Sequence, residues 1–174
     1  MKTENHIRNI YKNLSIEDYY QNHDYFNPHF GNIEYLIDEF KNIKTFDNKN
    51  ILDLCCGNGE ISNLFPESFV TGCDPYTFEK YKLKTNNDCL SKSFLDIVKT
   101  GLDKKYDFII CSYGLHLCDN SLKSNLMYIL SQYAKNLIVI TSNDNCIKNI
   151  NWWNLIQCNE FNRTKLFYFT TKNI

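Results

Sequence analysis

The chain has 174 residues, of which 43% are hydrophobic and 15% aromatic, so we expect one domain that buries its core without metal or disulfide support. A formal net charge of −1, without long runs of Lys or Arg, gives no general attraction to a nucleic-acid backbone. No stretch approaches the ~20 apolar residues of a membrane span, and the polar start of the chain lacks the apolar segment of a signal peptide.

The first 49 residues predict a helical segment ahead of the core. Apolar residues recur at i, i+3 and i+4 over Ile7–Tyr20 and over Ile33–Phe46, the spacing that is typical of amphipathic helices. We interpret residues 1–49 as an N-terminal helical cap and residues 50–174 as the core of the same domain, which spans residues 1–174.

From residue 50 onward, short apolar runs alternate with segments of helical period. The expected strands are Asn50–Cys55, Phe69–Asp74, Ser91–Phe94, Tyr106–Ser112 and Leu137–Thr141. The expected helices are Gly59–Phe65, Phe78–Asn86 and Ser121–Ala134, and a long connection follows the third strand. Strands that are separated by helices predict a parallel, doubly wound sheet with helices on both faces.

The end of the chain changes this pattern. Trp153–Phe161 and Thr164–Thr170 are two runs typical of strands, and only Asn162 and Arg163 separate them. Because no helix lies between the two runs, they predict an antiparallel hairpin at the edge of the sheet. The predicted fold class is therefore α/β, with a Rossmann-like, doubly wound, mostly parallel sheet that ends in an antiparallel β-hairpin.

The eight cysteines favour free thiols over disulfides or a metal site. Several lie in or beside apolar runs, where a thiol behaves as a small hydrophobe, and the chain is not a short secreted scaffold. No C-x-x-C pair exists, and the adjacent Cys55 and Cys56 would point to opposite sides of a strand. We expect a reduced, cytoplasmic protein without a bound metal.

A glycine turn follows the first expected strand. Gly57, Asn58 and Gly59 begin a near match to the G-x-G-x-x-G of dinucleotide sites, with Asp74 at about the right distance to bind a ribose. Asp53 argues against a dinucleotide, because a carboxylate beneath the turn would face pyrophosphate charge of the same sign. This arrangement would suit a ligand that carries positive charge.

The segment from Asp53 to Gly59, DLCCGNG, resembles the first motif, D-x-G-x-G-x-G, of the class I S-adenosylmethionine-dependent methyltransferases. Cys55 stands in place of the first glycine, and a residue this small slightly narrows the crevice. The resemblance implies an enzyme that binds S-adenosyl-L-methionine, which has an ammonium, a sulfonium and no phosphate. The product of the cofactor would be S-adenosyl-L-homocysteine.

The same resemblance implies which residues hold the cofactor. Asp74, in VTGCDPY, stands where the family has an acid that binds both ribose hydroxyls, and Pro75 and Tyr76 would pack on the adenine. Asp96, with its two apolar neighbours, stands where an acid meets the adenine amino group. The implied cofactor-binding residues are Asp53, Cys55, Gly57, Asn58, Gly59, Asp74, Pro75, Leu95, Asp96, Ile97 and Ser112.

Two segments that carry histidines are candidates for the acceptor site. The fourth expected strand leads into Ser112-Tyr113-Gly114-Leu115-His116, which resembles the family's apolar strand, short loop and histidine but is not the N-P-P-Y of amino-group methylation. His116 could act as a general base, since an unperturbed pKa near ~6.5 suits this role at neutral pH, or it could pack on the next helix.

The second segment, YYQNHDYFNPHF, resembles the stretch before the first motif in a group of small methyltransferases of unknown substrate. Such segments close over the cofactor and shape the acceptor pocket, although an aromatic surface helix is the alternative. The candidate catalytic residues are His116 and His29. The candidate substrate-pocket residues are Tyr20, Tyr25, Asn27, His29, Tyr113 and His116.

The acceptor itself is not specified by these motifs. We expect no added recognition domain, which favours a small molecule as acceptor, or a partner protein that supplies recognition. A non-catalytic subunit that binds S-adenosylmethionine would have the same motifs. An RNA methyltransferase would need a basic face. The residues to map for such a face are Lys80, Lys82, Lys84, Lys104, Lys105, Lys148 and Arg163.

Overall fold

The structure is a computed structural model, and it describes residues 26–148 and 150–172. The helix that we expect over Ile7–Tyr20 lies outside these residues, as do the candidate pocket residues Tyr20 and Tyr25. Within the described residues, no helix is long and apolar enough to cross a membrane.

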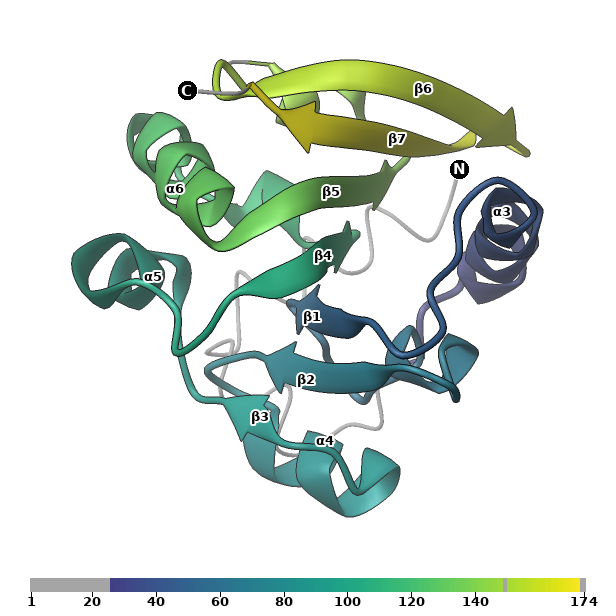
Figure 1. Cartoon of the computed structure of the whole chain (residues 1–174), viewed down its shortest axis with the longest axis horizontal. Coiled ribbons are helices and arrows are strands. Elements are labelled where there is room, and N and C mark those ends of the chain that lie inside the picture. Colours follow the sequence, from purple (N-terminus) through teal and green to yellow (C-terminus); the bar gives the residue numbers. More distant parts are fainter. Residues whose placement is uncertain (1–25, 149, 173–174) are drawn as a thin grey trace, which may run out of the picture.

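The core is a seven-stranded sheet in the order β3-β2-β1-β4-β5-β7-β6 (Figure 1). The strands are β1 (Asn50–Leu54), β2 (Phe69–Cys73), β3 (Cys89–Leu90), β4 (Tyr106–Ser112), β5 (Ala134–Thr141), β6 (Trp153–Phe161) and β7 (Thr164–Thr171). Strands β1 to β5 pair in parallel, whereas β7 pairs antiparallel with both β5 and β6. This arrangement confirms the predicted mostly parallel sheet with an antiparallel hairpin at its end.

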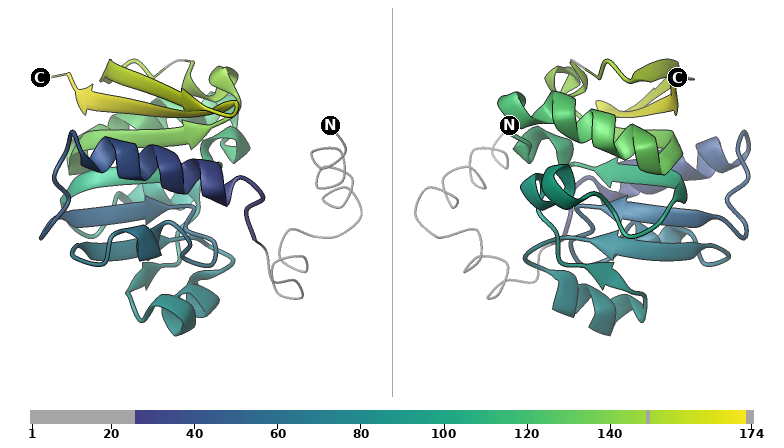
Figure 2. Two further views of the ribbon diagram at one scale, coloured as in Figure 1. Left: turned by 90° about the vertical axis from the view of Figure 1, so that its right-hand side faces the viewer. Right: turned by 60° about the vertical axis from the view of Figure 1, so that its left-hand side comes forward.

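Helices cover both faces of the sheet, as predicted. Figure 2 shows α3 (Phe30–Lys41) on one face and α5 (Phe94–Thr100) with α6 (Asn120–Tyr133) on the other. A further helix, α4 (Phe78–Thr85), packs at the end of the sheet that is formed by β2 and β3. Three short 3-10 helices are η1 (Ser62–Leu64), η2 (Leu115–Leu117) and η3 (Asp144–Ile147). Each face has its own apolar cluster, because buried parallel strands direct alternate side chains to opposite sides.

Two predicted helices are wrong in type or in bounds. The helix expected over Gly59–Phe65 is only the 3-10 turn η1, because Pro66 disfavours a helical conformation at the residue before it. The helix expected over Ile33–Phe46 begins at Phe30 and ends at Lys41. The apolar Phe46 lies in the following loop, where its ring packs 4.9 Å from that of Phe65.

The third strand is also misplaced in the prediction. It lies at Cys89–Leu90 and not at Ser91–Phe94, and the helix α5 occupies part of the expected long connection. The cause is a capping box, in which the Ser93 side chain accepts from the Asp96 N–H and the Asp96 carboxylate accepts from the Ser93 N–H. This start signal for a helix stops the strand before Ser93.

The terminal hairpin has the expected turn. Asn162 and Arg163 have φ values of 46° and 66°, which is the left-handed conformation of a two-residue type I′ turn. The hairpin packs on α3, where the ring of Tyr35 stacks on Phe161 at 4.1 Å and Phe40 lies 5.1 Å from Tyr168. The turn itself lies beside the loop that follows β4, since the Tyr113 hydroxyl is 2.9 Å from Oγ1 of Thr164.

Candidate functional site

A cavity of about 460 Å³ opens where β1, β2 and β4 end. Its walls come from the loop after β1, the segment after β2, the start of α5 and the loop after β4, with Asn27 from the segment before α3. Ligands of open α/β sheets bind at this carboxyl edge, because the loops there diverge to opposite faces. The volume is within the usual range for a small-molecule site.

The glycine turn after β1 forms one wall of this cavity. Gly57 and Gly59 have φ values of 53° and 88°, and a Cβ on Gly57 would meet no atom within 4 Å. The backbone at Gly57 therefore leaves open space for a ligand. Cys55, at the position of the missing first glycine, has a φ of 62°, so its backbone is also left-handed and strained for a residue with a side chain.

Asp53 supports the turn from below and does not line the cavity. Its side chain is 1% exposed, and its Oδ2 accepts a hydrogen bond of 2.7 Å from Ser62, whose Oγ is also 2.7 Å from the Tyr81 hydroxyl. Burial raises the pKa of Asp53 to about 7, against the smaller effect of the Ser62 hydrogen bond. The expectation that Asp53 faces a cationic ligand does not match this position.

Asp74 lies at the end of β2 and lines the cavity. Its Oδ1 accepts hydrogen bonds from the N–H groups of Tyr76, at 2.8 Å, and Thr77, at 3.0 Å. Its Oδ2 has no hydrogen-bond partner among the residues that the structure describes. Pro75 and Tyr76 line the same part of the cavity. The local turn thus fixes the carboxylate and leaves one oxygen for a ligand.

Asp96, predicted to meet the adenine amino group, and its neighbours Leu95 and Ile97 do not line the cavity. Asp96 is exposed in α5, and its Oδ2 accepts from the Ser93 Oγ at 2.6 Å, a bond that lowers the pKa of Asp96. Leu95 is 47% exposed and Ile97 is fully buried in the core, so neither lines the cavity. Because β3 ends earlier than expected, the residues that line this wall are Lys92, Ser93 and Phe94.

The loop after β4 forms the opposite wall. Ser112 and Tyr113 line the cavity, and the Ser112 Oγ is buried with no hydrogen-bond partner in the described part of the chain. The ring of His29 stacks on Tyr113 with centroids 4.8 Å apart and a 7° angle between the planes. His116 lies in η2, next to the cavity residue Leu117. Both candidate histidines thus lie beside the same wall.

Asn27 and Glu60 join the segment before α3 to the glycine turn. The Asn27 N–H donates to Glu60 Oε1 at 3.2 Å, and the Asn27 Oδ1 accepts from the His29 N–H at 2.9 Å. Both Asn27 and Glu60 line the cavity. No local sequence pattern singles out Glu60, because its partner Asn27 is 33 positions away.

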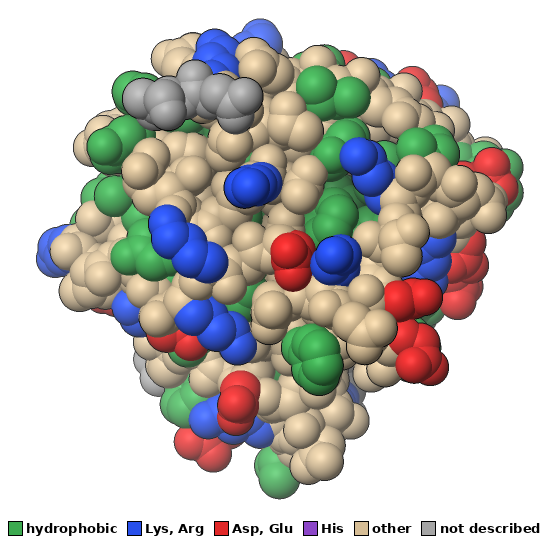
Figure 3. Space-filling model, viewed as in Figure 1, with side chains coloured by type: hydrophobic (Ala, Val, Ile, Leu, Met, Phe, Trp, Pro, Cys, Tyr) green, Lys and Arg blue, Asp and Glu red, His purple; other side chains and the backbone are tan. Residues whose placement is uncertain are grey.

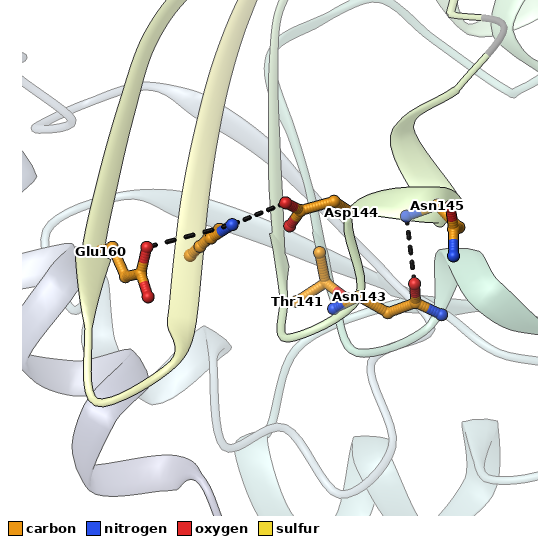
Figure 4. A network of polar contacts seen from close by, with 6 residues as sticks. Thr141, Asn143, Asp144, Asn145 and Glu160 are labelled. Carbon is orange, nitrogen blue, oxygen red and sulfur yellow. Dashed lines mark hydrogen bonds and ion pairs between the residues drawn. The ribbon is translucent and has the colours of Figure 1, made fainter.

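The terminal hairpin supports the Tyr113 wall through a second set of polar contacts. The Tyr113 hydroxyl lies 2.9 Å from Oγ1 of Thr164, which is 1% exposed. The Lys165 Nζ lies 2.6 Å from the carboxylate of Asp144 and 3.9 Å from that of Glu160. Figure 4 labels these two acidic residues. These contacts hold the loop after β5 against the hairpin, near the carboxyl edge where the site lies.

A second hollow of about 880 Å³ lies at the opposite, amino edge of the sheet. It is lined by the starts of β1, β4 and β5 and by the lysines Lys105, Lys135 and Lys172. None of the predicted site residues lines this hollow. Within residues 26–148 and 150–172, no group of three or more His, Cys, Asp or Glu side chains could hold a metal ion.

The comparisons with known proteins agree with this geometry. A family model described as a methyltransferase domain matches residues 23–174. An uncharacterized protein of Schizosaccharomyces pombe is 26% identical over 130 residues, an alignment that covers 52% of this chain and 53% of that protein. The chain therefore spans about half the length of the curated relative that it matches.

Solved structures share the fold. Magnesium protoporphyrin IX methyltransferase (ChlM) from Synechocystis PCC 6803, with bound SAM, has a TM-score of 0.69 and 13% identity and covers 99% of this chain and 98% of its own. The N-methyltransferase NodS from Bradyrhizobium japonicum WM9, in complex with S-adenosyl-L-homocysteine, has a TM-score of 0.68 and 12% identity, with coverage of 95% and 98%. An rRNA methylase from Escherichia coli has a TM-score of 0.64 and 11% identity, with coverage of 83% and 65%. With the family match and the predicted motif, the chain belongs to the class I S-adenosylmethionine-dependent methyltransferases.

Proposed function

We propose that this chain transfers the methyl group of S-adenosyl-L-methionine to a small-molecule acceptor and releases S-adenosyl-L-homocysteine. The observation that carries the proposal is a single cavity that joins the glycine turn, Asp74 and the polar end of β4. A ligand in this cavity would meet a carboxylate at one wall and hydroxyl groups at the other.

The residues present fit the two halves of this cofactor. Asp74 Oδ2, which lacks a partner in the described residues, would accept hydrogen bonds from the ribose hydroxyls. Pro75 and Phe94 supply apolar surface for the adenine, and the open space at Gly57 admits the methionine part. The buried, unpartnered Ser112 Oγ, so described within residues 26–148 and 150–172, would be satisfied by a bound ligand.

The cofactor supplies a sulfonium methyl that is already activated for displacement. The chain has to align the acceptor with it and keep water out, and these two effects account for much of the rate in such transfers. We propose that His29 is the base for a hydroxyl acceptor, because it is half-buried and fixed against Tyr113. His116, whose side chain is exposed, would shape the rim of the pocket.

The distribution of basic residues favours a small acceptor over RNA. Lys80, Lys82 and Lys84 lie on α4. Lys104 and Lys105 precede β4 at the amino edge of the sheet, Lys148 follows η3, and Arg163 is in the hairpin turn. Figure 3, which is viewed like Figure 1, shows the side of the molecule at the amino edge of the sheet, opposite the site. There, Lys and Arg side chains lie among neutral and acidic ones, without a continuous basic surface. RNA binding relies on such a surface.

We also propose a cytoplasmic location for this chain. All eight cysteines are free thiols, and six of them are buried. Reducing compartments keep thiols in this state, whereas oxidising ones favour disulfides.

The fold neighbours include both acceptor classes in their names, a porphyrin methyltransferase and an rRNA methylase, so the test has to compare them. Calorimetry should detect binding of S-adenosyl-L-homocysteine and no binding of NAD. The purified chain, supplied with S-adenosylmethionine labelled in the methyl group, should then label the small-molecule fraction of a cell extract. Label in the RNA fraction would replace the proposed acceptor class, and cofactor binding without any transfer would favour a non-catalytic subunit.

A further inference from the structure

The cavity has two acidic side chains and one basic side chain in its walls. The acidic residues are Glu60 and Asp74, and the basic residue is Lys92. The Lys92 Nζ is already used, because it donates to the Thr100 Oγ1 at 2.9 Å and to the Gly101 carbonyl at 2.7 Å. The interior of the cavity therefore favours a ligand that carries positive charge.

The two carboxylates come from different walls. Asp74 follows β2 and is fixed by the N–H groups of the turn before α4. Glu60 belongs to the glycine turn and is fixed by the Asn27 N–H, which uses Oε1 only. Glu60 Oε2 has no hydrogen-bond partner in the part of the chain that the structure describes. Each carboxylate thus has one oxygen bound to the protein and one left for a ligand.

Glu60 is half-buried, and this position costs free energy unless a cation accompanies it. Burial raises the pKa of Glu60, and the Asn27 hydrogen bond and the charge of Lys84 offset this only in part. A ligand cation near Oε2 would compensate for the lost solvation. Asp53, the acid of the first motif, cannot fulfil this role, because it is 1% exposed and does not line the cavity.

We propose that Glu60 binds the ammonium group of the methionine part of the cofactor and so selects ligands that carry this group. The assignment rests on the proposed function, since it takes S-adenosylmethionine as the ligand. Through the Asn27 N–H, the same carboxylate also holds the segment that carries His29. Cofactor recognition and the acceptor side of the pocket are thereby joined at one side chain.

Two ligands and two matched variants test this assignment. S-adenosyl-L-homocysteine has the ammonium group, whereas 5′-methylthioadenosine has the same adenine and ribose without it. Glu60→Gln removes the charge but keeps a carbonyl oxygen that can accept from the Asn27 N–H. The variant should therefore fold, and its unfolding temperature should match that of the wild type. Glu67→Gln is the control, because Glu67 is an exposed residue of the same connection and does not line the cavity.

Calorimetry should show that Glu60→Gln lowers the affinity for S-adenosyl-L-homocysteine by roughly ten- to a hundredfold, the usual effect of losing a charged hydrogen bond. The affinity for 5′-methylthioadenosine should stay within about twofold, and Glu67→Gln should change neither. Equal losses for both ligands, or no loss for S-adenosyl-L-homocysteine, would overturn the assignment. Absence of S-adenosyl-L-homocysteine binding to the wild type would instead overturn the proposed function.

Discussion

Cys55 and Gly114 fit each other across the carboxyl edge of the sheet. A Cβ on Gly114 would lie 2.5 Å from the Cβ and 2.6 Å from the Sγ of Cys55, closer than real Cβ atoms approach. The first glycine of the family motif is thus absent after β1, and a glycine after β4 provides the space that Cys55 needs. The side chain added at one strand end is thus accommodated by a glycine at the end of another strand.

This pair gives a rescue experiment. Gly114→Ala should lower the free energy of unfolding by about 1 to 3 kcal/mol, the usual cost of overpacking. The Gly114 φ of −109° is open to alanine, and the closest atoms to the new Cβ belong to Cys55, at 2.5 and 2.6 Å, whereas Cys111 Sγ lies 3.3 Å away. The double variant Gly114→Ala/Cys55→Gly should recover most of that loss, since it removes the thiol and the left-handed strain together. Urea unfolding of the wild type, the two single variants and the double variant measures the coupling free energy between residues 55 and 114. Purely additive changes in the free energy of unfolding would show that the two residues do not interact.

The sequence predicted the sheet well because its central strands are buried on both sides. YDFIICS in β4 and LIVIT in β5 are continuous apolar runs, and such runs indicate parallel strands without any information on the partners. The hairpin was predicted because only Asn162 and Arg163, and no helix, separate two runs typical of strands, and these two residues form the turn. The prediction of the third strand was wrong because the strand has only two residues and a capping box closely follows it.

For the candidate site, local motifs located the turn and Asp74 but not the environment of each acid. Asp53, Asp74 and Asp96 look alike in the sequence, as acids at or after strands. Their surroundings differ, since Asp53 is buried beneath the turn, Asp74 lines the cavity and Asp96 caps a helix. The role of Glu60 depends on Asn27, so only the folded chain reveals it.

Asp53 should make stability depend on pH. Its pKa of about 7 in the folded state lies above the ordinary value of 3.8. Ionisation of Asp53 therefore does not lower the free energy of unfolding below about pH 4, and it lowers this free energy most above about pH 7. A difference of about three between the two pKa values corresponds to a cost of up to about 4 kcal/mol. Asp53→Asn should therefore gain stability relative to the wild type as the pH rises from 4 to 8.

Denaturant unfolding at several pH values measures this effect. Asp47→Asn is a suitable control, because it makes the same substitution at an exposed carboxylate. A difference between Asp53→Asn and the wild type that stays constant from pH 4 to pH 8 would show that Asp53 is ionised throughout, and that burial does not raise its pKa.

Asp74 should separate ligand binding from folding. Asp74→Asn keeps an Oδ1 that can accept from the N–H groups of Tyr76 and Thr77, but it loses the second acceptor oxygen. We expect the unfolding temperature of Asp74→Asn to match that of the wild type, and its binding free energy for S-adenosyl-L-homocysteine to weaken by about 1.5 to 3 kcal/mol.

Asp74→Ala should weaken binding by a similar amount and also lower the free energy of unfolding by about 1 kcal/mol, because the N–H groups of the turn lose their acceptor. Calorimetry and thermal unfolding together distinguish the two variants, and unchanged affinity in Asp74→Asn would remove this residue from the ribose site.

His29 and His116 should differ in their effect on turnover. The His29 ring is half-buried and stacks on Tyr113, which lines the cavity, whereas the side chain of His116 is exposed. With the acceptor found by label transfer, His29→Ala should lower kcat by roughly a hundredfold or more, the usual contribution of a general base. His116→Ala should change KM for the acceptor and leave kcat within about tenfold.

The affinity for S-adenosyl-L-homocysteine provides the control, since it should stay within about threefold of the wild type in both variants. Neither histidine lines the cofactor cavity itself, so a large loss of affinity would indicate a structural role. The pH profile of kcat/KM separates a base from a wall residue, because its acidic limb should disappear in His29→Ala and persist in His116→Ala. If both variants keep kcat within tenfold, neither histidine accepts the proton, and the rate comes from alignment of the acceptor with the methyl group.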